Sequence, residues 1–266
     1  MRLKNRVVVV TGSCTGIGKA IVRRSVQEGA LVVVHGLQES LGESLGESLV
    51  DELGADRAAL LIEDLTNDGA PERLVEFAIQ KFGRLDAIVN NAAMIATGTI
   101  QDTSAERFNE FIRINTLAPY LLIRAALPEL SARRGSVLNI GSVNAYCGES
   151  NLLPYSISKG ALMTMTRNLG DTLLREEGVR VNQINPGWVL TEAENERKRA
   201  EGLGDDWVDR LPKSYAPSGR IIQPCEIAAA AVYWLSDECG PVSGQVVDLE
   251  QYPFIGRNPQ KDKAIL

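Results

Sequence analysis

The sequence has little of the chemistry that metal sites and charge-relay triads require. Its 266 residues include one histidine, His35, and four cysteines (positions 14, 147, 225 and 239) without a C-x-x-C pair. A structural zinc site needs four closely organised Cys or His ligands, and a Ser-His-Asp triad would need His35 as its base. Because His35 ends the apolar run Leu31–Val34, we interpret it as a structural histidine at a strand end. We therefore predict no metal site.

Long apolar runs and an excess of positive charge are also missing. The formal net charge is −6, so the chain gains no counterion-release affinity for nucleic acid. No run approaches the ~20 apolar residues of a membrane span. The run Val7–Val10 is shorter than the ~7–15 residues of a signal-peptide core. We expect a cytoplasmic protein with neither nucleic acid nor membrane as a partner.

Short β-branched runs alternate with longer amphipathic stretches, which is typical of a doubly wound α/β fold with helices on both faces. No linker divides the chain, so we predict one domain, 1–266. The capping box Thr103–Glu106 indicates one helix start, and Asn67 or Asp68 ahead of Pro71 indicates another. The predicted strands, about seven and all parallel, are Val7–Val10, Leu31–His35, Ala58–Ile62, Asp86–Asn90, Ser136–Ile140, Val179–Ile184 and Gly244–Leu249.

A glycine-rich loop follows the first predicted strand. Gly12 permits a sharp turn, Gly16 lets the backbone approach a pyrophosphate, and Gly18 lets the next helix pack close to the strand. The N-terminus of that helix supplies N–H groups and a favourable dipole for phosphate. Because a strand precedes the loop and a helix pattern follows it, we predict a Rossmann-type dinucleotide site.

A tyrosine and a lysine are placed for proton transfer. Tyr155 and Lys159 are four residues apart in a helical stretch and so share one face. A nearby ammonium favours the phenolate, so we expect a pKa of Tyr155 below the usual ~10. Such a tyrosine can act as a base in alcohol oxidation and an acid in carbonyl reduction. Ser142, after the fifth predicted strand, can hydrogen-bond the substrate oxygen. The alternative interpretation of Tyr155 and Lys159 is a surface pair on a helix without a catalytic role.

These motifs resemble, in this order and over almost the whole chain, the short-chain dehydrogenase/reductase family. The matching segments are T-G-x-x-x-G-x-G from Thr11, Asp64, Asn90-Asn-Ala-Ala93, Asn115, Ser142, Tyr155-x-x-x-Lys159 and Asn185-Pro-Gly187, with Ala93 where glycine is usual. The resemblance implies that Ser142, Tyr155, Lys159 and Asn115 are catalytic. It also implies that Lys159 binds the nicotinamide ribose and that Asn115 holds a water between Lys159 and a proton relay.

The resemblance also implies a set of cofactor contacts. The adenine would lie at Asp64 and Leu65, and the nicotinamide would lie beside Pro186–Val189. The implied cofactor-binding residues are Gly12, Thr15, Gly16, Ile17, Gly18, Leu37, Asp64, Leu65, Asn90, Ala92, Tyr155, Lys159, Pro186, Gly187, Val189 and Thr191.

The choice between NAD and NADP depends on charge near the second strand. The deciding positions, by alignment with the family, are Gly36 and Leu37, and the other phosphate-clamping position is Thr15. None of these carries a positive charge, so a 2′-phosphate would be poorly compensated. We favour NAD over NADP.

The substrate end of the site is polar. Residues 191–215 resemble the family's mobile lid, although a solvated helix face is the alternative. Asn144, Glu149 and Asn151 near Ser142 suit a sugar, sugar acid or polyol, and 5% aromatic residues give little support to a flat apolar ligand. The predicted substrate-binding residues are Ser142, Asn144, Tyr155 and Trp188.

We therefore expect an NAD(P)-dependent oxidoreductase that moves a hydride between its cofactor and an alcohol or carbonyl of a small polar molecule. The alternatives are a 3-oxoacyl-thioester (acyl carrier protein) reductase and a non-catalytic nucleotide-sensing regulator. The resemblance also implies a homotetramer built on helices at about Ala105–Leu127 and Tyr155–Glu176 and on the last strand near Gly244–Leu249. The apolar residues Ala161, Leu162, Met163 and Met165 would add to that interface, and the tail 251–266 would cross to a neighbouring subunit.

Overall fold

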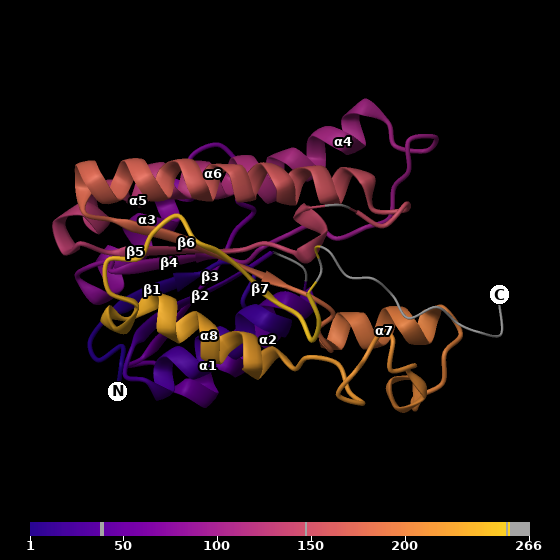
Figure 1. Cartoon of the computed structure of the whole chain (residues 1–266). Coiled ribbons are helices and arrows are strands. Elements are labelled where there is room, and N and C mark those ends of the chain that lie inside the picture. The colour runs from indigo at the N-terminus through magenta and orange to yellow at the C-terminus, as the bar shows by residue number, and fades with distance from the viewer. Residues whose placement is uncertain (38–39, 147, 254, 256–266) are drawn as a thin grey trace.

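The computed structural model describes residues 1–37, 40–146, 148–253 and 255. Its centre is a seven-stranded sheet in the order β3-β2-β1-β4-β5-β6-β7, with every pair parallel, so the predicted doubly wound fold is confirmed (Figure 1). The strands are β1 (Val7–Val10), β2 (Leu31–Gly36), β3 (Ala58–Ile62), β4 (Ala87–Asn90), β5 (Ser136–Ile140), β6 (Arg180–Pro186) and β7 (Val246–Leu249).

Helices cover both faces of this sheet, as Figure 1 shows. One face carries α1 (Gly16–Gln27), α2 (Ser40–Leu53) and α8 (Pro224–Leu235). The other carries α3 (Ala70–Phe82), α5 (Ala118–Arg133) and α6 (Leu153–Glu177). The remaining helical segments are α4 (Ala105–Ile112), the π-helix η1 (Arg113–Leu117), α7 (Glu192–Ala200) and the 3₁₀ turns η2 (Val143–Ala145), η3 (Trp207–Arg210) and η4 (Asp237–Cys239).

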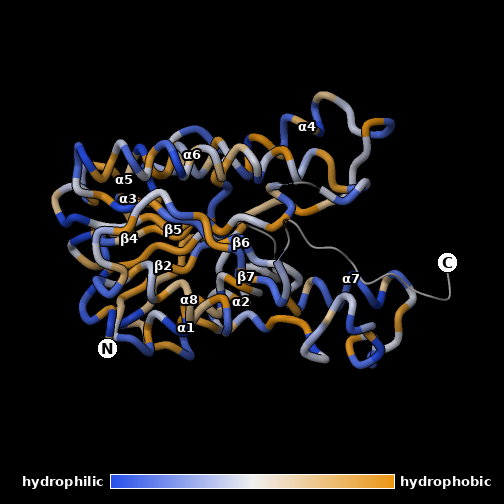
Figure 2. The backbone as a smooth tube through the Cα atoms, in the orientation of Figure 1, coloured by the Kyte–Doolittle hydropathy of each residue, from blue (hydrophilic) through white to orange (hydrophobic). Residues whose placement is uncertain are grey.

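The alternation of side chains along each buried strand creates two cores. In β1, Val8 and Val10 pack with α1 and α8, whereas Val7 and Val9 pack with α3 and α5. All four are fully buried, which explains why the strand is a continuous valine run rather than an alternating pattern. Figure 2 shows these hydrophobic strands running between the more polar helices on either side.

Two helix starts differ from the sequence predictions. The cap of α4 is Ser104, whose hydroxyl accepts from the Arg107 N–H at 3.2 Å, so the predicted cap at Thr103 is wrong by one residue. The cap of α3 is Gly69 in the left-handed conformation, not Asn67 or Asp68. A glycine reaches a φ of +73° without the steric cost that an L side chain would bring.

The strand order places the functional edge of the sheet. β1 lies between β2 and β4, where the order reverses, and ligands of such sheets bind beyond the carboxyl ends of the strands at this point. The α7 segment extends beyond that edge (Figure 1). Among the described residues, no helix is long and apolar enough to cross a membrane.

Candidate active site

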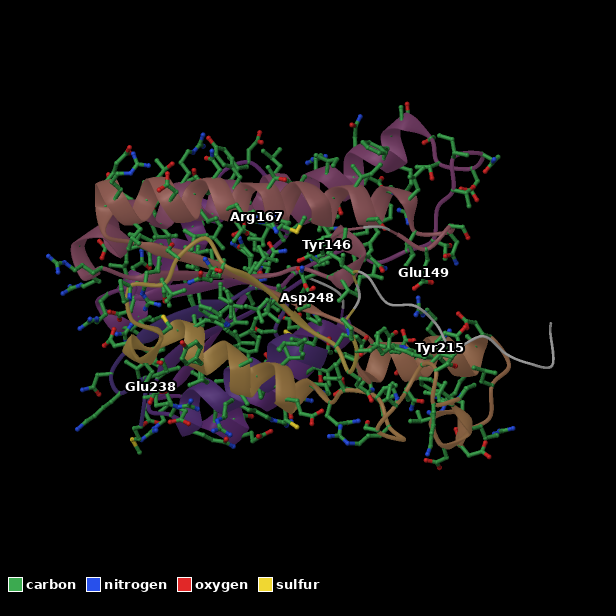
Figure 3. The ribbon with its side chains drawn as sticks, in the orientation of Figure 1. Tyr146, Glu149, Arg167, Tyr215, Glu238 and Asp248 are labelled. Atoms are coloured by element: carbon green, nitrogen blue, oxygen red, sulfur yellow. The ribbon has the colours of Figure 1, made fainter. Side chains whose placement is uncertain are left out.

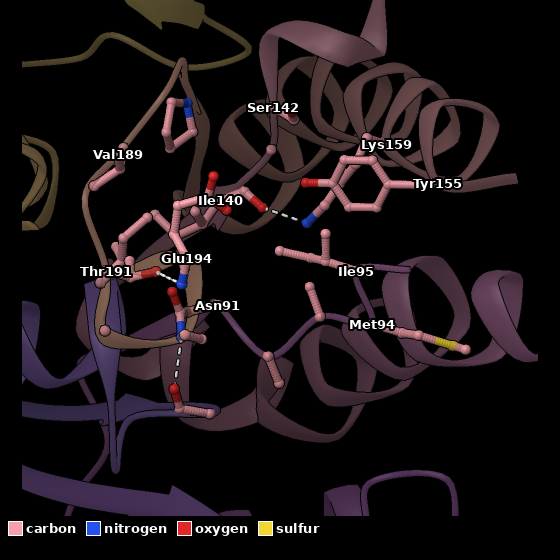
Figure 4. A pocket seen from close by; sticks show the side chains of 18 of the residues that line it. Asn91, Met94, Ile95, Ile140, Ser142, Tyr155, Lys159, Val189, Thr191 and Glu194 are labelled. Atoms are coloured by element: carbon pink, nitrogen blue, oxygen red, sulfur yellow. Dashed lines mark hydrogen bonds between the residues drawn. The ribbon is translucent and has the colours of Figure 1, made fainter. Parts of the chain in front are cut away.

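A cavity of about 1200 Å³ opens at the carboxyl edge of the sheet. It extends from the glycine loop and the end of β2 to the segment after β5, the first turns of α6 and the α7 segment (Figure 4). Single ligand pockets usually measure roughly 300–1,000 Å³, so the cavity has room for a dinucleotide together with a small substrate.

The glycine loop has the geometry that its sequence predicts. Gly12 has a φ of +59°, and a Cβ at this position would lie 2.8 Å from the Cα of Ala92. A Cβ on Gly18 would lie 2.5 Å from the side-chain nitrogen of Asn91, which donates to the carbonyls of Thr11 and Gly12. Gly18 therefore lets α1 approach the β4 loop and does not itself line the cavity.

The loop also presents an N–H group to an anion. The Gly16 N–H donates to the carboxylate of Glu192 at 3.2 Å. This carboxylate oxygen is held by a backbone N–H at the start of α1, where phosphate oxygens of dinucleotides bind in such folds. The donor set of the loop therefore fits the pyrophosphate of a nicotinamide cofactor.

His35 fixes this loop from β2. Its Nδ1 accepts from the Gly12 N–H at 3.2 Å, and its Nε2 donates to the Glu63 carbonyl at 2.9 Å. Burial lowers the pKa of His35 to about 4, so the imidazole is neutral. The structural interpretation of the histidine agrees with these bonds, although its ring also lines the cavity.

The three residues predicted to carry out proton transfer lie together on one wall of the cavity, as Figure 4 shows. Ser142 follows β5 and is hydrogen-bonded to the hydroxyl of Tyr155. Tyr155 is 6% exposed, and the ammonium of Lys159 lies 5.8 Å from the centre of its ring. Lys159 donates to the Ile140 carbonyl at 2.8 Å. The hydroxyls and the ammonium thus face the same space.

The expected low pKa of Tyr155 is wrong for the chain alone. Burial raises the pKa of Tyr155 to about 12, and the hydrogen bond from Ser142 opposes this only in part. Burial likewise lowers the pKa of Lys159 to about 8. Burial of the Tyr155 phenolate costs more free energy than the attraction of the Lys159 ammonium returns.

Asn115 lies behind this wall rather than on it. It belongs to η1, the π-helix between α4 and α5, and is 1% exposed. Its side chain accepts from the Met94 N–H at 2.8 Å and donates to the hydroxyl of Ser158 at 2.9 Å. Ser158 precedes Lys159 in α6, so Asn115 joins the β4 loop to the helix that carries the tyrosine and lysine. Single π turns inside helices often occur at functional sites.

Ser142 is held in place by a polar group at the end of β6. The Ser142 N–H donates to the side chain of Asn185 at 3.1 Å, and Asn185 in turn donates to Asp248 of β7 at 3.0 Å. Tyr146 also hydrogen-bonds Asp248, and Figure 3 shows the two side chains close together. Burial raises the pKa of Tyr146, and the Asp248 carboxylate raises it further.

Most of the predicted cofactor and substrate residues line the cavity. Asn90 does not, because its buried side chain donates to Asn139 at 2.8 Å; its neighbour Asn91 lines the cavity instead. The predicted residues that do line it are Gly12, Thr15, Gly16, Ile17, Leu37, Asp64, Leu65, Ala92, Ser142, Asn144, Tyr155, Lys159, Pro186, Gly187, Trp188, Val189 and Thr191.

The cavity has further lining residues outside the predicted sets of cofactor-binding and substrate-binding residues. Glu194, Arg197 and Lys198 come from α7, and Glu250 and Tyr252 follow β7. Glu149 and Tyr215 line the cavity from the β5–α6 segment and the lid, and both are labelled in Figure 3. The lid's charge pattern was the one available signal for the α7 residues, whereas nothing local marks the two that follow β7.

The lid, residues 191–215, packs around two tryptophans, Trp188 just before it and Trp207 within it. The rings of Trp188 and Trp207 have centroids 5.5 Å apart. The Trp188 indole N–H donates to Glu194, and that of Trp207 donates to Asn195, each at 2.9 Å. Trp207 is 4% exposed, whereas α7 buries none of its residues and keeps a solvated face. In the described part of the chain, no group of three or more His, Cys, Asp or Glu residues could hold a metal ion.

Comparisons with known proteins agree with this geometry. A family model described as enoyl-(acyl carrier protein) reductase matches residues 12–250. L-fucose dehydrogenase of Mus musculus is 38% identical over 238 residues, covering 89% of this chain and 84% of that protein. An uncharacterized oxidoreductase of Thermotoga maritima is 31% identical over 251 residues, covering 94% and 98%. Momilactone A synthase of Oryza sativa subsp. japonica is 32% identical over 249 residues, covering 92% and 88%.

The match spans the glycine loop, the serine, tyrosine and lysine of the cavity wall, and strands β2 to β7. The chain therefore belongs to the short-chain dehydrogenase/reductase family, whose members are oxidoreductases that act on CH–OH groups with a nicotinamide cofactor.

Proposed function

We propose that this chain is an NAD-dependent dehydrogenase of a free sugar. The observation that carries the proposal is that Ser142, Tyr155 and Lys159 share one cavity with the glycine loop. Support for a sugar comes from the similarity to L-fucose dehydrogenase and from the polar side chains of Asn144 and Glu149 in the same cavity.

Proton transfer in this proposal is the work of the Tyr155 hydroxyl. Ser142 donates a hydrogen bond to the substrate oxygen, and the Tyr155 oxygen, as the phenolate, takes the proton from that oxygen during oxidation. Lys159 favours the phenolate, and the nicotinamide cofactor supplies the acceptor for the hydride that leaves the carbinol carbon. Asn115, through Ser158 and α6, holds Lys159 in place and is a candidate for the water-mediated proton relay.

Three features support NAD over NADP. Leu37 lines the cavity and is 52% exposed, so an apolar side chain stands where a phosphate clamp would be needed. A Cβ on Gly36 would lie 2.6 Å from the Cys14 sulfur, which leaves no room there for a basic side chain. On α1, Arg23 is paired with Glu52 and turned to that partner. Gln38, which follows Leu37 and also carries no positive charge, lies outside the described residues.

We also propose that the chain is one cytoplasmic domain that assembles as a homotetramer through α4, α5 and α6. Tyr120 of α5, Ile157 of α6 and Leu117 of η1, which joins α4 to α5, leave apolar surface exposed. Two of the residues expected to add to this surface do not, because Leu162 is 1% exposed and Met165 packs against the core of its own chain. The described start of the tail, through Tyr252, also lies against its own chain's cavity.

The proposed function is tested by NADH absorbance with a panel of substrates and both cofactors. The panel contains L-fucose and other neutral sugars, sugar acids, polyols and a 3-oxoacyl thioester. We expect oxidation of at least one neutral sugar, with a higher kcat/KM for NAD than for NADP. Turnover of the thioester alone, with NADPH, would instead support the acyl carrier protein reductase alternative.

A further inference from the structure

The segment after the last strand meets both ends of the lid. Residues 188–190 lead from β6 into the lid and residues 216–222 lead out of it; we call these two segments the stems. Val189 and Ile222 form a parallel β-bridge, and the Leu190 N–H donates to the Ile222 carbonyl at 2.8 Å. The lid is therefore a closed loop whose stems lie side by side at the carboxyl edge of the sheet.

Glu250 holds the first stem. Its carboxylate accepts from the Trp188 N–H at 2.9 Å and from the Gln251 N–H at 2.6 Å. Gly187 makes this contact possible, because a Cβ there would lie 1.9 Å from a carboxylate oxygen of Glu250. Hydrogen bonds to an ionised acceptor are among the stronger ones in proteins. The carboxylate thus fixes the backbone of Trp188, the residue that begins the first stem.

Gln251 holds the second stem. Its side-chain oxygen accepts from the Ser218 N–H at 3.0 Å and from the Ser218 hydroxyl at 2.6 Å. Its side-chain nitrogen donates to the Arg220 carbonyl at 2.7 Å. Two consecutive residues therefore satisfy polar groups of both stems, and all these partners lie at least 31 residues away in sequence.

What the first stem carries is the indole of Trp188. This side chain lines the cavity, packs against Trp207 with the rings tilted by 34°, and donates its N–H to Glu194. Glu250, which lines the same cavity, sets the backbone position from which the indole projects. An aromatic face beside a sugar ring contributes binding through dispersion contacts that depend on close approach.

We propose that Glu250 and Gln251 form a clamp that fixes the lid across the cavity and sets Trp188 as a wall of the substrate pocket. Both are positioning residues, since they act through the stems. The substrate part of this proposal rests on the proposed function, whereas the clamp itself rests on the hydrogen bonds alone.

Glu250→Gln and Gln251→Ala test the clamp. The first variant keeps the shape of the side chain but offers one acceptor oxygen to two N–H groups, and the second removes the bonds to Ser218 and Arg220. Gln245→Ala is the matched control, because Gln245 is exposed and precedes the same strand. Amide hydrogen exchange over residues 188–222, the Kd of NADH and the sugar KM and kcat are measured for all four proteins.

We expect faster exchange over residues 188–222 in both variants, and in the control the wild-type rate. We expect the sugar KM to rise by about tenfold while kcat and the Kd of NADH change by less than about threefold.

Exchange as slow as in the wild type in both variants would overturn the clamp, and so would an NADH affinity that falls as far as the sugar affinity. If Glu250→Gln does not fold, Gln251→Ala decides alone. A wild-type protein that oxidises no sugar would refute the proposed function, and the exchange data would still decide the clamp.

Discussion

The buried imidazole of His35 makes the free energy of unfolding of this protein depend on pH. The pKa of the imidazole is about 4 in the folded chain against an ordinary 6.5, and the residue is 2% exposed. Below pH 6.5 the unfolded chain binds a proton that the folded chain does not. Stability therefore rises with pH in this window. The contribution of the neutral histidine is fully present above pH 6.5 and is lost as the pH falls toward 4.

The size of the effect follows from the two pKa values. Lowering the pH from about 8 to about 5 should reduce the free energy of unfolding by about 2 kcal/mol. Arginine partners lower the pKa values of Glu28 and Glu226 to about 2. Protonation of these two carboxylates reduces the free energy of unfolding mainly below this pH range. Because His35 is the only histidine in the chain, no other imidazole contributes.

Urea unfolding followed by tryptophan fluorescence, at fixed protein concentration and at several pH values, measures this loss. His35→Asn is the informative variant, because its amide keeps an acceptor near the Gly12 N–H and cannot titrate. We expect the pH-dependent loss in the wild type and its absence in the variant. A wild type equally stable at both pH values, or a variant with the same slope, would refute the neutral, buried histidine.

Other consequences can be measured on single variants. Leu37→Arg should improve the kcat/KM for NADP by about tenfold or more, because a charge-assisted contact contributes roughly 1.5–3 kcal/mol. An unchanged kcat/KM for NADP would show that Leu37 does not lie at the phosphate-clamping position. Gly12→Ala should lower the free energy of unfolding by about 2 kcal/mol or more, from its φ of +59° and the close Cα of Ala92, and unfolding in urea at the wild-type midpoint would contradict this. Glu192→Gln should tighten NADH binding, seen in fluorescence titration, because the carboxylate competes with phosphate for the Gly16 N–H. Light scattering at micromolar concentration should find a tetramer, and a monomer would refute the assembly proposal.

The strands were predictable because their positions depend on local composition. β1 is a run of four valines and forms at the residues that the pattern indicates. The ends were less predictable, since they depend on distant partners. β6 continues to Pro186 because that residue pairs with Leu249 of β7, and β4 begins at Ala87 because Asp86 turns its carboxylate to the Val7 N–H.

The site was predictable where its residues follow strand ends, as Ser142 does after β5, or share a helix face, as Tyr155 and Lys159 do on α6. The partners of Glu250 and Gln251 were not, since they lie across the fold and no local pattern marks them. The pKa of Tyr155 was predicted in the wrong direction because spacing along a helix reveals a neighbouring charge but not the depth of burial.

We propose that Tyr155 transfers the proton, in a cavity that binds the cofactor independently of the tyrosine hydroxyl. The most direct test compares wild type and Tyr155→Phe for NADH formation from the preferred sugar and for NADH affinity by fluorescence titration. The variant loses one oxygen, so we expect turnover to fall by at least ~10²-fold, while the Kd of NADH stays within about twofold of the wild type. A variant that retains most of the wild-type turnover would contradict the claim.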